Sequence, residues 1–132
     1  MSGETHLSTL LSTLSPQLLE DESVFCTFAS AVYGDQAALA PVASVMESEG
    51  LTLVVPRQKA DAHGICYESV FRGITLTVHS SLDAIGLTAA FSAKLTEQGI
   101  SANVIAGFYH DHVFVQSEEA DRAMSALKQL SD

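Results

Sequence analysis

The pattern of apolar and polar positions predicts a strand–helix–strand–strand segment between residues 74 and 115. It begins with a half-buried strand, because Ile74, Leu76 and Val78 alternate with polar residues. A helical stripe follows, made of Ala84, Leu87, Thr88, Phe91 and Leu95. Two further strands are expected, one at residues 100–105 and one around Val113 and Val115.

The same pattern places shorter elements before this segment and a helix after it. In chain order we expect a helix at 7–14, an acidic connector at 17–23, a buried strand at 24–29, a helix from Pro41 to Gly50, a strand at 51–55, a helical turn at 56–63, a strand at 65–70 and a helix starting at Ser117. The helix at Pro41 is expected because proline suits a first helical turn, with Val42, Val45 and Met46 facing inward.

Composition and charge narrow the class of protein. The 132 residues suit one compact domain or two very small ones, and the formal net charge is -10. Such a surface repels phosphate backbones and anionic lipid, so we expect neither nucleic acid nor membrane as a partner. With no signal peptide or membrane span in view, a cytoplasmic protein is expected, with Cys26 and Cys66 reduced in its core.

Two stretches of the second half carry a family resemblance. They are HSSLDAIGL and GISANVIAGFYHDHVFV, in which the matching residues are His79, Ser80, Ser81, Leu82, Gly86, Leu87, Gly99, Ile100, Asn103, Ala106, Gly107, His110, Asp111 and His112. The chain resembles the small ACT-domain proteins, and closely an uncharacterised bacterial group with two ACT-like halves. The resemblance implies ferredoxin-like βαββαβ units, and regulatory modules that commonly bind amino acids at the interface between two units.

The resemblance and the element count together predict the fold. We expect an α+β protein with two ferredoxin-like halves, residues 1–70 and 71–132, and antiparallel sheets covered by helices. The second half supplies only βαββα, and an open sheet edge would invite association. A strand from the first half, with residues 24–29 as the candidate, or a neighbouring chain is therefore expected to complete it. The halves would then be interlocked.

A candidate ligand site lies where the strand at Ile74 gives way to the following helix. Free backbone N–H groups and the helix dipole suit a carboxylate there. The loop contains no lysine or arginine, so a polyphosphate is a less suitable ligand than a single carboxylate. The candidate residues are Ser80, Ser81, Leu82, Asp83, Ala84, Ile85, Gly86 and Leu87. The resemblance adds Asn103 and Val104. In the alternative interpretation, Ser80, Ser81 and Asp83 only cap a helix and Gly86 permits close packing.

His110, Asp111 and His112 form a second cluster. At strand spacing the two histidines share one side and Asp111 faces the other. His110 and His112 could hold a metal, with His79 as a third ligand, but two histidines are a weak signal and a structural or ligand-orienting role is favoured. A serine–histidine–aspartate hydrolase is disfavoured, because adjacent strand residues face apart and no GxSxG motif is present.

The sequence therefore predicts a regulatory binding module and not an enzyme. We expect a small ligand, in the first place an amino acid, with no cofactor and no metal. A homodimer and a separately encoded regulated enzyme or transporter are the expected protein partners. A metal-binding protein using His110 and His112, and a pure interaction scaffold, remain the alternatives.

Overall fold

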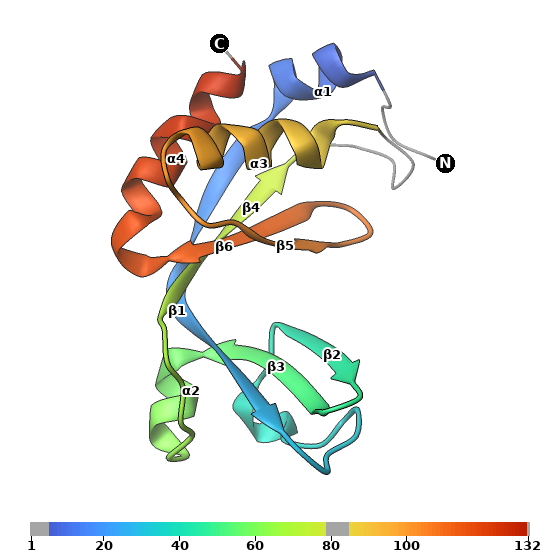
Figure 1. Cartoon of the computed structure of the whole chain (residues 1–132), viewed down its shortest axis with the longest axis vertical. Helices are drawn as coiled ribbons and strands as arrows, with labels where there is room; N and C mark the ends of the chain where they lie inside the picture. The colour runs from blue at the N-terminus through green and yellow to red at the C-terminus, as the bar shows by residue number, and fades with distance from the viewer. Residues whose placement is uncertain (1–5, 79–84, 132) are drawn as a thin grey trace. The chain divides into compact units, whose positions relative to one another are not determined.

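A computed structural model describes residues 6–78 and 85–131 of the chain, which form an α+β fold (Figure 1). The elements in order are α1 (Leu7–Thr13), β1 (Ser15–Phe28), η1 (Ala37–Leu39), β2 (Ala43–Glu47), β3 (Gly50–Pro56), α2 (Arg57–Ala62), β4 (Phe71–Thr77), α3 (Leu87–Glu97), β5 (Asn103–Ala106), β6 (Asp111–Gln116), η2 (Ser117–Glu119), α4 (Ala120–Lys128) and η3 (Gln129–Ser131). The strand order is β2-β3-β1-β4-β6-β5. None of the described helices is long and apolar enough to cross a membrane.

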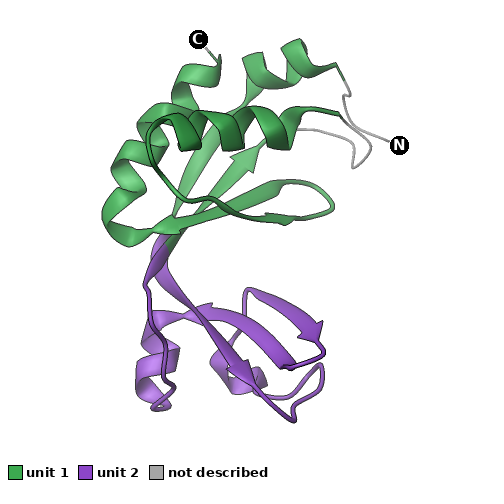
Figure 2. Cartoon of the chain, viewed as in Figure 1, with its two compact units in different colours: residues 1–19, 72–132 green, residues 20–71 purple. Residues whose placement is uncertain are grey.

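The chain divides into two compact units (Figure 2). Unit 1 contains residues 1–19 and 72–132, and unit 2 contains residues 20–71. They differ from the predicted halves in the placement of the first nineteen residues. The reason is that β1 runs from Ser15 to Phe28 and contributes its beginning to unit 1 and its end to unit 2.

Unit 1 is a helix-covered sheet with the ferredoxin-like strand order. Its strands lie in the order β1, β4, β6, β5, so the beginning of β1 takes the place of the strand that the second half lacks. Ile74, Leu76 and Val78 turn inward, as the period-2 pattern predicts, and meet Phe91 of α3 and Leu127 of α4 in one apolar core. These five side chains are almost completely buried.

Unit 2 is a smaller sheet, with the strand order β2, β3, β1. Strand β3 pairs antiparallel with both neighbours, and Leu51, Leu53 and Val55 turn one face of it into the core. This cluster is completed by Ala60 of α2, Leu39 of η1 and two residues of β1, Val24 and Cys26. The core is small because the segment between β1 and β2 forms only a three-residue 3-10 turn.

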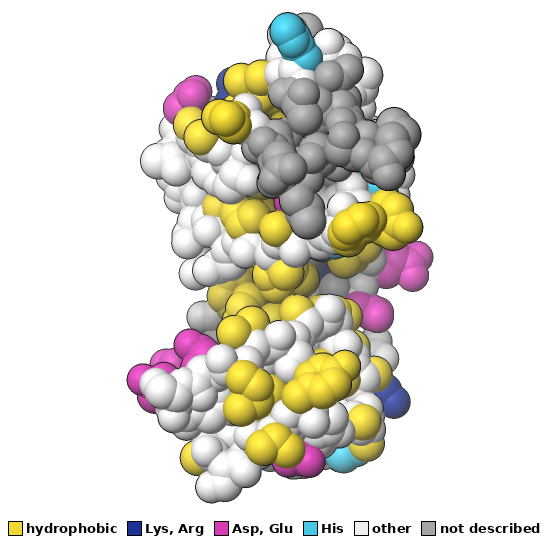
Figure 3. Space-filling view, turned by 90° about the vertical axis from the view of Figure 1, so that its right-hand side faces the viewer, with side chains coloured by type: hydrophobic (Ala, Val, Ile, Leu, Met, Phe, Trp, Pro, Cys, Tyr) yellow, Lys and Arg dark blue, Asp and Glu magenta, His cyan; other side chains and the backbone are white. Residues whose placement is uncertain are grey.

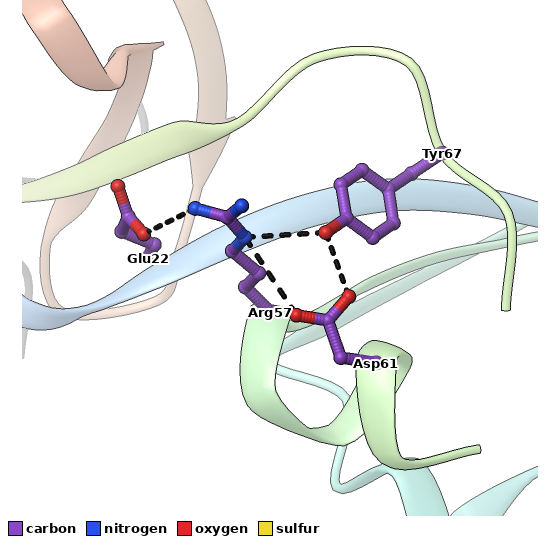
Figure 4. A network of polar contacts seen from close by, with 4 residues as sticks. All are labelled: Glu22, Arg57, Asp61 and Tyr67. Atoms are coloured by element: carbon purple, nitrogen blue, oxygen red, sulfur yellow. Dashed lines mark hydrogen bonds and ion pairs between the residues drawn. The ribbon is translucent and has the colours of Figure 1, made fainter. Parts of the chain in front are cut away.

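A network of polar side-chain contacts joins α2 to other parts of unit 2 (Figure 4). Arg57 donates from Nε to the hydroxyl oxygen of Tyr67 at 3.1 Å, and from Nη1 to Glu22 Oε1 at 2.9 Å. The Tyr67 hydroxyl in turn donates to Asp61 Oδ1 at 2.7 Å. The network therefore links β1, α2 and the following loop through polar side chains, in addition to the apolar packing of Ala60.

The structure corrects four sequence-based expectations in the first half. The expected connector at 17–23 lies inside β1, and the expected helix after Pro41 is instead the strand β2. Residues 24–28 are the end of β1 and pair with β3 in unit 2, whereas the beginning of the same strand completes the sheet of unit 1. Residues 65–70 form no strand, and Cys66 is exposed, whereas Cys26 is buried.

Candidate functional site

The start of α3 is the described part of the predicted ligand site. Ser80, Ser81, Leu82, Asp83 and Ala84 lie outside the described residues. Gly86 precedes α3 with a φ of 97°, a left-handed conformation that glycine adopts without strain. Leu87 is buried in the core, whereas Ile85 is 86% exposed and Thr88 is also exposed. The first turn of α3 thus has one buried anchor, with exposed residues on either side of it.

Helix α1 packs against this start. A Cβ atom added to Gly86 would lie 3.1 Å from Leu7 Cδ2 and 3.7 Å from Leu7 Cδ1. Gly86 therefore leaves room for a side chain of the first helix, Leu7, to pack closely against it. A larger residue at this position would disturb both the backbone conformation and the contact with α1.

Strands β5 and β6 carry the second part of the predicted site. Asn103 lies directly opposite Phe114, and Val104 lies opposite Val113. The Asn103 amide donates from Nδ2 to the Phe114 carbonyl at 3.2 Å, so this exposed side chain is already engaged with the neighbouring strand. Val104 packs against the core of unit 1.

His112 is positioned by a neighbouring strand. Its Nδ1 lies 3.0 Å from Thr75 Oγ1 on β4, and His110 Nδ1 lies 3.4 Å from the Val78 carbonyl oxygen. Gly107 makes the turn between β5 and β6 possible, because an added Cβ would lie only 2.8 Å from the His110 carbonyl oxygen. Both histidines therefore have structural partners around this turn.

Burial shifts the titration of the two adjacent residues in opposite directions. Desolvation raises the pKa of the Asp111 carboxyl above its ordinary value, and the charges of His112 and His110 oppose that shift. Desolvation lowers the pKa of His112 first, His110 lowers it further, and Asp111 opposes both. Neutral forms of both groups are therefore favoured relative to the same groups in water.

The described residues offer no third ligand for a metal ion at His110 and His112. Across residues 6–78 and 85–131, no three histidine, cysteine or carboxylate side chains gather in a way that could hold a metal ion. His79, the expected third ligand, lies outside the described residues.

Sequence reasoning also missed a groove of about 250 Å³ on unit 1, lined by Gln98, Asp121, Arg122, Ser125, Ala126 and Gln129. Its residues come from α3 and α4 regions 20 or more positions apart, and no motif marks them.

The ferredoxin-like strand order of unit 1, with a glycine directly before α3, defines a class of small α+β modules. Models of the ACT domain match residues 2–72 and again residues 68–129. Since the first of these covers more than half of the 132 residues, the chain belongs to the ACT-domain family. The two matches confirm the tandem arrangement. No curated protein sequence matches the chain.

Solved structures agree with this assignment. A Vibrio cholerae protein of unknown function, described as a possible transport protein, is 50% identical, with 96% of each chain covered and a TM-score of 0.87. An Agrobacterium tumefaciens protein is 15% identical, with 89% of each chain covered and a TM-score of 0.69. The regulatory subunit of aspartate kinase from Thermus thermophilus is 11% identical over 91% of this chain and 97% of its own, with a TM-score of 0.64. The last two show a shared fold.

Proposed function

We propose that this chain is a regulatory module that binds a small carboxylate ligand, in the first place an amino acid, at the start of α3. The proposal rests above all on that helix start. The backbone N–H groups of a first helical turn have no partner within the helix, and the helix dipole makes them favourable for a carboxylate. Gly86 lies directly before these N–H groups and has no side chain that could block access to them.

The proposed contacts divide between polar and apolar parts of the ligand. The first-turn amides after Gly86 receive the carboxylate, with the hydroxyls of Ser80 and Ser81 as additional donors. Ile85 and Val104 contact the apolar part, and Asn103 lies at the beginning of the next strand. His110, Asp111 and His112 orient the ligand or this end of the sheet, and they hold no metal and catalyse no reaction.

The regulatory part of the proposal follows from family membership. Two ACT domains fill the chain, and the structural neighbours include proteins described as regulatory subunits of aspartate kinase. By analogy we propose that ligand binding alters the association of this chain with a separate enzyme or transporter. The chain acts as a sensor and not as a catalyst.

The test measures binding when one first-turn amide is removed. Proline is tolerated in the first turn of a helix but has no N–H, so Thr88→Pro deletes one proposed donor at an exposed position. Thr88→Ala is the matched control, because it removes the side chain and keeps the amide. Isothermal titration with a panel of amino acids is expected to give binding for the wild type and for Thr88→Ala, and a clear loss for Thr88→Pro.

Thermal melts of the three proteins separate binding from folding. If Thr88→Pro melts like Thr88→Ala but binds more weakly, the amide contributes to the site directly. No heat with any amino acid, or equal affinity for both variants, would remove the start of α3 as the carboxylate site.

A further inference from the structure

Strand β2 is the outer strand of unit 2. Among the described residues it stands at one end of the strand order, with β3 on one side and no strand on the other. Five consecutive residue pairs join it to β3 without a bulge, from Ala43 opposite Val54 to Glu47 opposite Gly50. A regular outer strand of this kind offers backbone N–H and C=O groups to an additional strand.

Apolar side chains are exposed along this strand. Val45 is 52% exposed and Met46 is 53% exposed, and Val42, just before the strand, is 56% exposed. Because successive residues of a strand point to opposite faces, Val45 and Met46 leave apolar surface on both sides of the edge. The side of the molecule that carries β2 shows several separate hydrophobic patches (Figure 3).

The usual protection of an outer strand is missing here. Natural edge strands are commonly blocked by lysine, proline or a bulge, and β2 contains none of these. Its one charged residue is Glu47, whose carboxylate accepts a hydrogen bond from the hydroxyl of Thr52 on β3. That contact turns the charge toward the neighbouring strand.

The charge around β2 indicates the sign of a partner. Residues 1–56 contain no lysine or arginine, and Asp35, Glu47 and Glu49 are exposed carboxylates in this part of unit 2. The first basic residue, Arg57, is paired with Glu22 at 2.9 Å. An incoming basic segment therefore gains electrostatic attraction, whereas a second copy of this acidic chain brings a net charge of the same sign.

We propose that β2 accepts an extended, basic segment of another protein as an added antiparallel or parallel strand. Main-chain hydrogen bonds supply affinity, and apolar side chains of the segment pack beside Val45 and Met46. Lysine or arginine residues flanking that segment approach the exposed carboxylate of Glu49. This surface consists of unit 2 residues, and the inference does not depend on a ligand at the start of α3.

Fluorescence anisotropy with two labelled peptides tests the proposal on the full chain. Both peptides alternate valine and threonine, and they differ only in flanking lysines or flanking glutamates. The lysine-flanked peptide is expected to bind, with affinity that falls as salt is raised. Val45→Lys should weaken it by about tenfold or more, whereas Val32→Lys, the same change at an exposed loop residue, should change it by less than about twofold.

Three results would overturn the proposal. The first is no binding of the lysine-flanked peptide to the wild type. The second is equal binding of both peptides, or an unchanged affinity in Val45→Lys. The third is self-association of the wild type in sedimentation velocity that Val45→Lys abolishes, because a second copy would then occupy the edge.

Discussion

Units 1 and 2 use related strand orders but are stabilised differently. Unit 1 buries fourteen apolar residues in one cluster among the described residues, with α1, α3 and α4 all contributing to it. The corresponding cluster of unit 2 contains seven buried residues, and its helix α2 is six residues long. Burial of apolar surface is the main favourable term in folding, so unit 1 has the larger share of it.

Unit 2 adds a polar network to its smaller apolar core. The Arg57 network joins residues that are partly exposed to water, with 43% of the Arg57 side chain accessible. Exposed ion pairs contribute little and weaken with salt. The comparison teaches that the two units should respond differently to mutation, truncation and salt, although both belong to one chain.

The largest expected effect comes from removing the N-terminal segment. A fragment of residues 70–132 lacks α1 and the beginning of β1, and therefore lacks Leu10 and Leu14, which are 0% and 3% exposed in the core of unit 1. We expect this fragment to show no cooperative urea transition by near-UV circular dichroism. Adding a peptide of residues 6–19 should restore one.

The matched control is the same peptide with Leu10→Ser and Leu14→Ser. It keeps the length and the backbone but cannot fill the apolar core, so it should not restore the transition. A fragment that folds cooperatively by itself would contradict the view that unit 1 needs its N-terminal part.

A smaller but still large effect is expected for Leu127→Ala in unit 1. Leu127 of α4 is fully buried, and truncation of such a side chain leaves a cavity that costs about 2–5 kcal/mol of unfolding free energy. Urea melts at one temperature measure the loss, and Lys128→Ala, an exposed neighbour in the same helix, serves as the control. Equal stability of the two variants would mean that α4 does not pack on the sheet.

The sequence predicted best where one face of an element meets the core. The spacing of apolar residues along β4, α3 and α4 is regular because one face of each element, with Ile74, Phe91 and Leu127, points into the same apolar cluster. The pattern failed for β2, since Val42, Val45 and Met46 fit a helical stripe, but Val45 and Met46 are exposed on a strand and Val42 is exposed just before it. The prediction of a connector at residues 17–23 was wrong for a related reason. These residues belong to a strand that is held by backbone hydrogen bonds, although their side chains are largely polar.

The candidate site shows the same limit of sequence reasoning. Its local features, such as the glycine before α3 and the turn at Gly107, were visible from residue types alone. The contacts of Leu7 with Gly86 and of Thr75 with His112 join residues far apart in the sequence, and only the folded chain brings them together. A single sequence contains no signal for either pair.

For unit 2, Tyr67→Phe removes one hydroxyl from the polar network and keeps the ring. Arg57 then loses an acceptor and Asp61 loses a donor, which should cost about 0.5–1.5 kcal/mol of unfolding free energy. Urea melts measure the change, and Tyr33→Phe, at a residue that is 80% exposed, is the matched control. A loss as large as that of Leu127→Ala would contradict the contrast between the two units.

The smallest effect is a change in the pH dependence of stability in unit 1. The folded state lowers the pKa of His112 below an unfolded value of about 6.5, so it binds the proton less tightly than the unfolded chain does. The stability associated with neutral His112 is therefore present above about pH 6.5 and is lost as the pH falls through the lowered folded pKa.

His112→Asn should flatten the decline in stability on acidification, because an amide near Thr75 does not titrate. Asp111→Asn provides the opposite comparison. The pKa of Asp111 is raised in the folded state, so the stability associated with its protonated form is lost as the pH rises through that folded pKa. Urea melts across the acidic range should show His112→Asn losing less stability than the wild type as the pH falls. An unchanged slope in His112→Asn would mean that the half-buried histidine of unit 1 is not what links its stability to pH.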